Sequence, residues 1–397
     1  MSTILIPEVP LAVPTLSETK TPSTPPNIEK LRADLARWLS IPPEDRDVVD
    51  FTLGVYKSHD IPGDPLWGII IDASGAGKTE LLRAFRNRPD AYFLSNLTEN
   101  TLVSGYRDPK SPDKDPSILP ELNEKVLVIK DLAPLLGMRA EARSAVIASL
   151  RDAYDGFTDQ GRGNLGRISY EARFTLLAAS TLAIERTDTV EQELGERFIK
   201  FRARSTDSKD KVRKAISNIG VDSSMRREIE GAVSSYLNDL PTASGASIPP
   251  ELREPLIELA IFTAKARSHV ARDRNGVIQY LPRPEVGTRL GKELGKLLLA
   301  LAIIRGKERP DWTDFGTVVR VAEDCIPPNR MAVLRALRFS DQTTSASDVE
   351  RETGLPHSTA FRTLEDLEVL GLVGSSAIGQ YDLGRKWKLV ADWRAAP

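Results

Sequence analysis

The sequence predicts an α/β fold with a parallel sheet, followed by an α-helical region and a small C-terminal domain of three helices and a hairpin. Two observations favour this fold class. Up to about residue 204, short continuous apolar runs alternate with segments of helical periodicity, as expected for buried parallel strands joined by helices. Beyond residue 204 the periodicity is helical, and from about residue 329 helices are followed by a hairpin pattern.

The composition excludes several classes of protein. Of the 397 residues, 41% are hydrophobic and 28% are charged, as in an ordinary soluble protein. The single cysteine, Cys325, rules out an internal disulfide framework, and the three histidines are too scattered for a metal cluster. The longest apolar run, Leu297 to Ile304, is too short to span a membrane, and the N-terminus lacks a signal-peptide pattern. We therefore expect a cytoplasmic protein. Its net charge of −2 means that any DNA binding must come from local basic patches.

The chain divides into four predicted parts. Residues 1–26 are rich in Pro, Ser and Thr and lack apolar periodicity, so a disordered tail is expected. Residues 27–204 are predicted to form the α/β core, 205–328 an α-helical lid, and 329–397 a winged helix-turn-helix.

The predicted elements follow in order. In the core we expect helices from Asn27 and over about 44–57 and 139–154, strands at 67–71, 91–94, 125–131 and 174–180, and a hairpin just before the fourth strand. In the lid we expect helices at about 207–218, 223–238, 249–270 and 287–305. The C-terminal domain should have three helices. The first is expected at 329–339, the second begins with a capping box formed by residues Ser347 to Glu350, and the third is expected at 357–370. A hairpin of Leu372-Val373 against Trp387 to Val390 should follow.

Residues 72–79 read Asp-Ala-Ser-Gly-Ala-Gly-Lys-Thr and connect the first strand to a helix. This is the arrangement of a phosphate-binding loop, in which backbone N–H groups surround a phosphate, Lys78 adds a positive charge and the Thr79 hydroxyl binds Mg²⁺. Glycine is usual at the first position, and Asp72 replaces it as a tolerable left-handed turn residue. We predict binding of ATP with Mg²⁺. The predicted nucleotide-binding residues are Ser74, Gly75, Ala76, Gly77, Lys78, Thr79 and Glu80.

Asp131, at the end of the third strand, is the predicted carboxylate for Mg²⁺ and for the attacking water. Two adjacent acids are usual at this point, but Lys130 and Leu132 flank Asp131 here. Either Asp131 organises the metal and Leu132 replaces the catalytic glutamate, or Lys130 replaces the metal acid and Asp131 polarises the water. In both cases hydrolysis would be slow or would need a partner.

Three further residues are predicted to act in catalysis. Thr181, at the end of the fourth strand beside Ser180, could position the attacking water, although a simple helix cap is the ordinary alternative. Arg197 is a candidate arginine finger for the γ-phosphate of a neighbouring subunit, and Arg289 a candidate sensor arginine acting in its own subunit. The alternatives are a surface salt bridge and a solvated helix arginine. Burial of Arg197 within its own chain would contradict a motor function.

In the C-terminal domain the predicted DNA contacts lie on the third helix and on the wing. They are His357, Ser358, Thr359, Arg362, Arg385, Lys386 and Lys388. The same helix also carries Glu365, Asp366 and Glu368, and residues 331–397 hold eight basic and nine acidic side chains. This balance argues against tight duplex binding, so docking of a protein is the alternative.

Together these motifs resemble those of the AAA+ ATPases, and within them the minichromosome-maintenance (MCM) helicase branch, over about residues 60–325. Residues 72–79 resemble the Walker A motif, 129–132 Walker B, 177–181 sensor 1, 196–198 the arginine finger and 288–290 sensor 2. Residues 155–173 lie where that branch inserts a DNA-contacting hairpin, and those helicases also end in a winged helix.

The resemblance implies an AAA+ domain that consists of a P-loop α/β core and a helical lid. It also implies a hexameric ring with ATP sites between subunits and DNA in the pore. The implied function is that of a DNA helicase or translocase in DNA replication. The N-terminal DNA-binding and zinc domain of those helicases would be missing, since only about 60 residues precede the ATPase. Two alternatives remain: a nucleotide-gated DNA-binding regulator, and a protein-remodelling or defence ATPase with weak hydrolysis.

Overall fold

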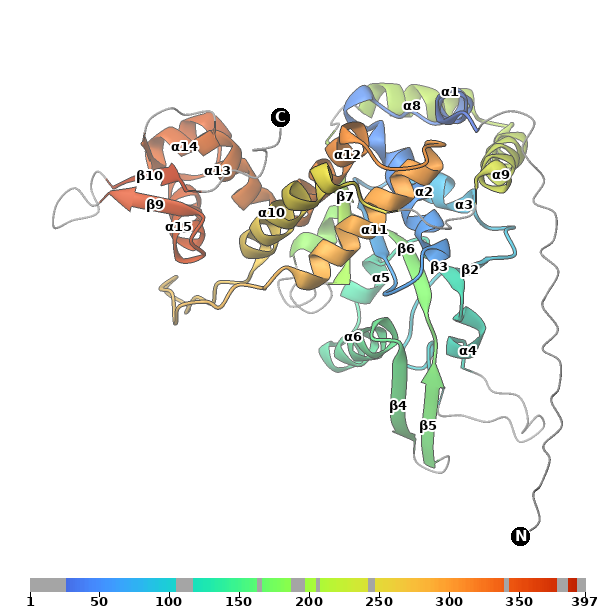
Figure 1. The fold of residues 1–397 in the computed structure, drawn as a ribbon, viewed down its shortest axis with the longest axis horizontal. Coiled ribbons are helices and arrows are strands. Elements are labelled where there is room, and N and C mark those ends of the chain that lie inside the picture. The colour runs from blue at the N-terminus through green and yellow to red at the C-terminus, as the bar shows by residue number, and fades with distance from the viewer. Residues whose placement is uncertain are drawn as a thin grey trace, which may run out of the picture.

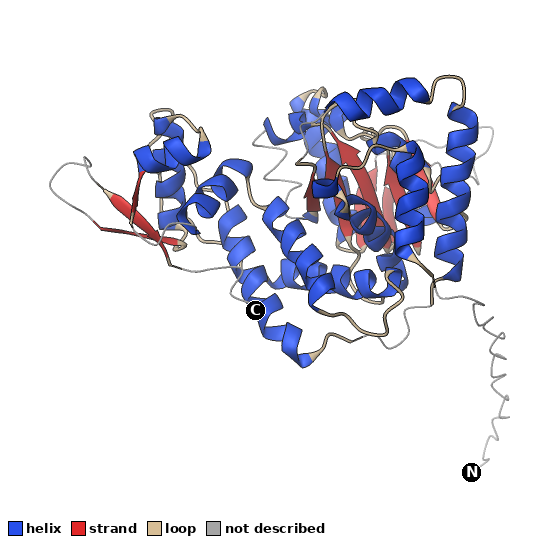
Figure 2. Cartoon of the chain, turned by 90° about the horizontal axis from the view of Figure 1, so that it is seen from above, coloured by secondary structure: helices blue, strands red, loops and turns tan. Residues whose placement is uncertain are grey.

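The computed structural model describes residues 26–104, 117–162, 166–186, 197–204, 208–241, 247–338, 343–376 and 385–390 (Figure 1). The predicted N-terminal tail lies outside these residues except for Pro26. Figure 2 shows helices on both sides of a central sheet, with the C-terminal domain set to one side. No helix in the described ranges is both long and apolar enough to cross a membrane.

The central sheet has five parallel strands in the order β2-β3-β6-β1-β7. Their bounds are β1 Trp67–Ile71, β2 Ala91–Leu94, β3 Lys125–Ile129, β6 Phe174–Ser180 and β7 Ile199–Arg202. The four strands predicted from apolar runs are therefore confirmed, and β7 is an additional strand. Because β6 lies between β1 and β3, the chain segments that follow these three strands meet at one edge of the sheet.

Alternate residues of the strands face two separate cores. On one side Ile70, Val128 and Leu177 belong to a large buried cluster with α1 (Ile28–Trp38), α2 (Asp47–Lys57) and the helices beyond residue 222. On the other side Ile69 and Ile129 pack with α6. The helices and turns of the α/β core not yet named are α3 Lys78–Arg83, α4 Leu119–Leu122, α5 Ala133–Leu136, α6 Ala140–Tyr154, and the 3₁₀ turns η1 Pro43–Asp45, η2 Ser58–Asp60 and η4 Leu182–Arg186.

The predicted hairpin before the fourth strand is present. It consists of β4 Phe157–Arg162 and β5 Gly166–Glu171, which pair in antiparallel register directly after α6. Figure 1 shows it projecting away from the sheet, with α6 and α4 near its base.

The region predicted to be helical contains α8 Ser208–Ser217, α9 Asp222–Asp239, α10 Pro250–Arg267, α11 Thr288–Ile304 and α12 Trp312–Cys325. The first four match the prediction, and α12 was not predicted. The large buried cluster continues from the sheet through α9, α10, α11 and α12, so these helices share one core with the strands. The assignment of residues 205–328 as a lid remains a prediction.

The helix α12 is tied to β7 by buried charges. The backbone N–H of Arg202 donates to Asp324 at 3.0 Å, and Arg320 donates to the same Asp324 carboxylate oxygen at 2.9 Å. The guanidinium of Arg320 also lies over the ring of Phe201, 4.7 Å from its centroid. The buried charges of Arg320 and Asp324 on α12 therefore have partners on β7.

The C-terminal domain contains α13 Pro328–Arg338, α14 Ala346–Thr353 and α15 His357–Val369, with a three-stranded sheet in the order β8-β10-β9. The strands are β8 Thr344–Ser345, β9 Val373–Ser376 and β10 Lys386–Leu389. The predicted capping box at Ser347 is wrong. Ser345 caps α14 and exchanges hydrogen bonds with Asp348, because β8 brings the chain in with extended backbone up to Ser345.

Candidate functional site

The loop from Asp72 to Thr79 forms an open cradle of backbone N–H groups between β1 and α3. Gly75 and Gly77 have φ angles of 76° and 88°, a left-handed conformation that favours glycine. A side chain at either position would meet no neighbouring atom, so the backbone conformation, rather than space, requires glycine there. The N–H groups from Ser74 to Thr79 make no hydrogen bond within the described parts of the chain. They are free to bind an anion.

Lys78 lies in this cradle and is held by the loop itself. Its ammonium donates to the carbonyl oxygens of Asp72 at 2.8 Å and Ala73 at 2.6 Å. Burial lowers the pKa of Lys78, and nearby Lys211 lowers it further, while the carboxylates of Asp72 and Asp131 oppose this shift. The predicted lysine and the predicted carboxylate are thus close enough to interact electrostatically.

Asp131 follows β3 at the same edge of the sheet. One of its carboxylate oxygens accepts a hydrogen bond from the N–H of Ala133 at 2.8 Å. The other makes no hydrogen bond among the described residues, so it can act as a ligand. Leu132, at the possible position of a second acid, is buried in the apolar core with 3% exposure. A hard cation such as Mg²⁺ prefers carboxylate and hydroxyl oxygens, and Asp131 with Thr79 supplies these donor types.

Ser180 ends β6, and Thr181 follows it, between the loop and Asp131. Ser180 pairs in register with Ile71, and its carbonyl accepts the N–H of Asp72 at 3.3 Å. Its hydroxyl is fully buried and has no hydrogen-bond partner among the residues that the structure describes. Thr181, the predicted residue, is half-buried, and its carbonyl begins the η4 turn. Both residues therefore lie at the predicted edge, with Ser180 nearer to the loop.

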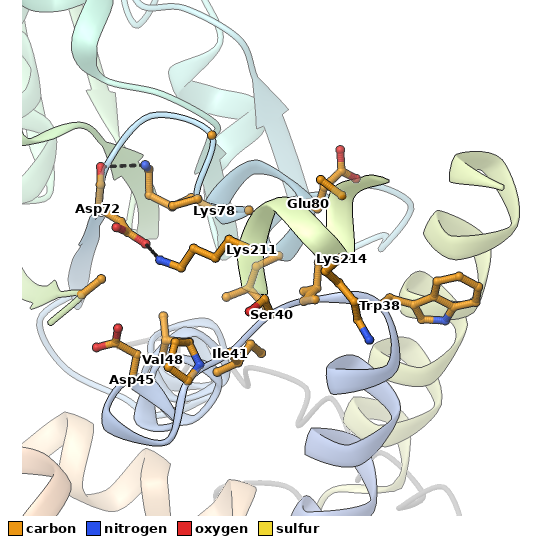
Figure 3. Close-up of a pocket in the computed structure, with 18 of the residues that line it drawn as sticks. Trp38, Ser40, Ile41, Asp45, Val48, Asp72, Lys78, Glu80, Lys211 and Lys214 are labelled. Atoms are coloured by element: carbon orange, nitrogen blue, oxygen red, sulfur yellow. Dashed lines mark hydrogen bonds and ion pairs between the residues drawn. The ribbon is translucent and has the colours of Figure 1, made fainter. Parts of the chain in front are cut away.

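A cavity of about 240 Å³ opens beside the cradle (Figure 3). Gly75, Ala76, Gly77, Lys78 and Glu80 of the predicted set line it. The opposite walls come from three distant segments: the connection between α1 and α2 with the start of α2, the strand β7, and the helices α8 and α9. The apolar wall includes Ile41, Val48 and Phe201. Sequence reasoning missed these residues because nothing local marks them as neighbours of the loop.

Two ion pairs join α8 and α9 to the loop. Lys211 on α8 lies 3.2 Å from the carboxylate of Asp72, and Arg226 on α9 donates to both oxygens of Glu80 at 3.0 Å each. Glu80, which was predicted to bind nucleotide, lines the cavity, and its carboxylate holds α9.

Arg197, the predicted finger, lies at the other edge of the sheet, just before β7. Its side chain pairs with Asp155 at 3.3 Å and lies over the ring of Tyr154, 5.6 Å from the centroid. Only 8% of the residue is exposed. Burial within its own chain counts against a finger role in this conformation, because the guanidinium is not presented to a neighbouring subunit.

Arg289 is also remote from the loop. It begins α11, pairs with Glu285 at 3.6 Å and does not line the cavity beside the loop. Its charge instead affects Tyr154 and Glu293, which are hydrogen-bonded to one another at 2.7 Å. Since Tyr154 packs on Trp67 at the start of β1, whereas the loop follows its end, the geometry does not support a cis sensor role for Arg289.

In the C-terminal domain, His357, Ser358 and Arg362 on α15 are exposed, and so are Lys386 and Lys388 on β10. Thr359 is half-buried. Arg385 is ion-paired with Glu368 and lies over the ring of Trp387, 5.3 Å from its centroid. Its role as a DNA contact stays a prediction.

A turn between α10 and α11 lies against α15. Arg272 donates to Glu365 at 3.2 Å, to Asp366 at 3.0 and 2.8 Å, and to the carbonyl of Arg362 at 2.9 Å. A Cβ atom added at Gly276 would lie only 2.7 Å from the Arg362 guanidinium. The turn thus touches Arg362, which was predicted to face a DNA groove, and the two acidic residues beside it, and sequence reasoning did not find this contact.

Comparison with known proteins supports the assignment of the C-terminal domain. Residues 330–376 match the family model of the IclR helix-turn-helix domain, which covers most of α13 and all of α14, α15 and β9. No curated protein matches the sequence of the chain. The fold is similar to a solved structure from Cytophaga hutchinsonii named "putative ATPase", with 12% identity, a TM-score of 0.45, and 75% of this chain and 85% of that chain covered. A similarity this low carries no functional argument.

Proposed function

We propose that the protein is an ATPase that links nucleotide binding to contact with DNA. The observation that carries this proposal is the cavity beside residues 72–79. There, unpaired loop N–H groups, the Lys78 ammonium and an apolar wall meet at the carboxyl edge of a parallel sheet. These are the three kinds of surface that the phosphates and the base of a nucleotide need.

In this proposal the loop N–H groups and Lys78 bind the phosphates, and Lys78 exchanges its two loop carbonyls for phosphate oxygens. The apolar wall of Ile41, Val48 and Phe201 takes the base. Thr79 and Asp131 would hold Mg²⁺, which neutralises charge on the phosphates when it is bound.

Hydrolysis is expected to be slow. Asp131 is the acid at the end of β3, and the neighbouring position holds the buried Leu132 instead of a second acid. One carboxylate must then serve either the metal or the water. Ser180 and Thr181 lie between Asp131 and the loop, so their hydroxyls are the candidates for orienting the water.

The finer form of the proposal is a hexameric, MCM-like helicase or translocase that acts in DNA replication. The hairpin β4–β5, which projects from the end of α6, supports it, because a projecting hairpin can contact DNA in a ring. The burial of Arg197 against Asp155 and Tyr154 counts against it, because a motor of this kind needs a guanidinium from each neighbour.

A second candidate is a nucleotide-gated DNA-binding regulator in which ATP controls assembly and little is hydrolysed. The contact of Arg272 with Glu365 and Asp366 favours it. This contact places a segment of the ATPase part against the helix that would read DNA, so that a change in one part can alter the other.

Three measurements on the full chain test these proposals. We expect purified protein to bind a fluorescent ATP analogue, and Lys78→Ala to abolish that binding while Arg86→Ala, an exposed residue just after α3, leaves it unchanged. ATPase rates with and without single-stranded DNA, measured beside particle mass with ATP, separate the two candidates. DNA-stimulated turnover in a ring supports the motor, and nucleotide-dependent assembly without turnover supports the regulator. Failure of the wild type to bind nucleotide contradicts both.

A further inference from the structure

We propose that Lys211 of α8 is a second phosphate-binding lysine of the nucleotide site, and that Asp72 holds it in position while the site is empty. This inference rests on the proposed function. It adds a ligand-binding residue about which the P-loop motif says nothing, supplied by a helix that begins more than a hundred residues after the loop.

The geometry brings two ammonium groups to one residue. Lys78 donates to the backbone carbonyl of Asp72 at 2.8 Å, and Lys211 lies 3.2 Å from its carboxylate (Figure 3). The other carboxylate oxygen of Asp72 accepts the N–H of Ala73 at 2.7 Å. The side chains of Asp72 and Lys211 are only 13% and 17% exposed. Both line the cavity together with Gly75 and Gly77. Lys211 is therefore already inside the site.

The charges explain why the pair exists. A carboxylate at the first loop position would repel a triphosphate, since it faces the same cavity as the cradle. Lys211 neutralises it. Asp72 in turn keeps Lys211 near Lys78, although two like charges repel one another.

A phosphate group can displace Asp72 as the ion-pair partner of Lys211. Ion pairs that are partly exposed to water are weak, whereas the charge of a triphosphate is several times that of one carboxylate. Lysine is suited to this exchange because its ammonium is a compact charge on a flexible stem. Lys211 then moves from Asp72 to phosphate oxygen, and Lys78 moves from the loop carbonyls in the same way.

The position of α8 is fixed by a second tie. Arg226 of α9, the helix that follows α8, holds Glu80 through two hydrogen bonds of 3.0 Å. The two ion pairs thus fasten α8 and α9 to either side of the loop, one at its first residue and one just after its last. This keeps Lys211 within reach of the phosphates.

The test is a set of affinity measurements on the full chain with ATP, ADP and adenosine. We expect Lys211→Met to weaken binding of ATP and ADP by about tenfold, the usual scale for losing a hydrogen bond to a charged group, without changing the affinity for adenosine. Arg213→Ala is the matched control, because it removes one positive charge from the same helix at an exposed residue that does not line the cavity. We expect it to leave all three affinities unchanged.

The double variant Asp72→Gly with Lys211→Met distinguishes phosphate binding from mere neutralisation of Asp72. If Lys211 contacts phosphate, the double variant stays weak for ATP. Recovery of wild-type affinity in the double variant would overturn the inference, as would unchanged ATP binding in Lys211→Met. An equal loss for adenosine would also overturn it, because that result indicates a displaced helix. Absence of ATP binding by the wild type would instead refute the proposed function.

Discussion

Arg272 and Asp366 are joined by two hydrogen bonds, of 3.0 and 2.8 Å, from one guanidinium to one carboxylate oxygen. Arg272 lies between α10 and α11, and Asp366 lies on α15 of the winged helix. Arg330, on α13, holds the other oxygen of the same carboxylate at 3.1 Å. Two acidic residues of α15, Glu365 and Asp366, are therefore engaged by other parts of the chain, which bears directly on how this domain can meet DNA.

The first prediction concerns this contact. We expect Asp366→Asn to weaken it and to raise the affinity for duplex DNA several-fold, because the turn around Arg272 leaves α15 more easily and one carboxylate is lost. Gel-shift or anisotropy measurements at fixed salt check this. Arg274→Ala, a change at an exposed residue of the same turn, is the control and should not raise affinity. Unchanged DNA binding by Asp366→Asn would show that the turn does not cover the DNA-reading face.

A second prediction concerns Asp131. We expect Asp131→Asn to retain ATP binding and to lower the turnover rate at least about tenfold, because the amide binds Mg²⁺ and polarises water poorly. Single-turnover hydrolysis beside equilibrium binding separates the two effects. The amide keeps the oxygen that accepts from Ala133, so the loop after β3 should be preserved. Undiminished turnover would remove Asp131 from the mechanism.

A third prediction distinguishes the two assignments of Asp131. If Lys130 stands where the metal-binding acid is usual, Lys130→Asp restores a pair of adjacent acids and should increase the hydrolysis rate about tenfold or more. If Asp131 already binds the metal, the new carboxylate gives no such gain. The ATPase rate as a function of Mg²⁺ concentration is the measurement, with Lys130→Ala as the control for losing the positive charge.

A fourth prediction concerns the pH dependence of stability. Glu293 is buried, and burial raises its pKa to about 7, against the opposing effects of Arg267 and Tyr154. A raised carboxyl pKa stabilises the fold at low pH, and that contribution is lost as pH rises from the unfolded value near 4.5 towards 7. Between pH 5 and 8 we expect the free energy of unfolding to fall by about 2 kcal/mol more for wild type than for Glu293→Gln. Denaturant titrations at several pH values check this, and parallel curves for the two proteins would show that Glu293 is not protonated in the fold.

Local patterns predicted a large part of the structure. The four apolar runs became β1, β2, β3 and β6, and the loop of residues 72–79 lies between β1 and α3 as expected. The three C-terminal helices were also predicted, although the cap of the second was placed at Ser347 and is Ser345. In each case the signal is contained within about ten neighbouring residues.

What could not be predicted depends on contacts between distant residues. The strand β7 and the helix α12 carry charges that look exposed in the sequence, but Arg202 is buried against Glu185 and the Ile326 carbonyl, and Asp324 against Arg320 and the Arg202 N–H. The walls of the cavity, and the contact of Arg272 with α15, also come from segments far apart in the chain. Arg197 and Arg289 fitted their motifs by spacing, yet spacing does not say which edge of the sheet an arginine occupies.

The acid at residue 72 also affects how sequences of this kind should be searched. A search pattern that requires glycine at the first position of the loop will miss such sequences. A carboxylate at that position together with a lysine 139 positions later identifies them. In such sequences we expect an acidic residue at the first site to be accompanied by a lysine at the second, which pairs with the carboxylate and then binds phosphate.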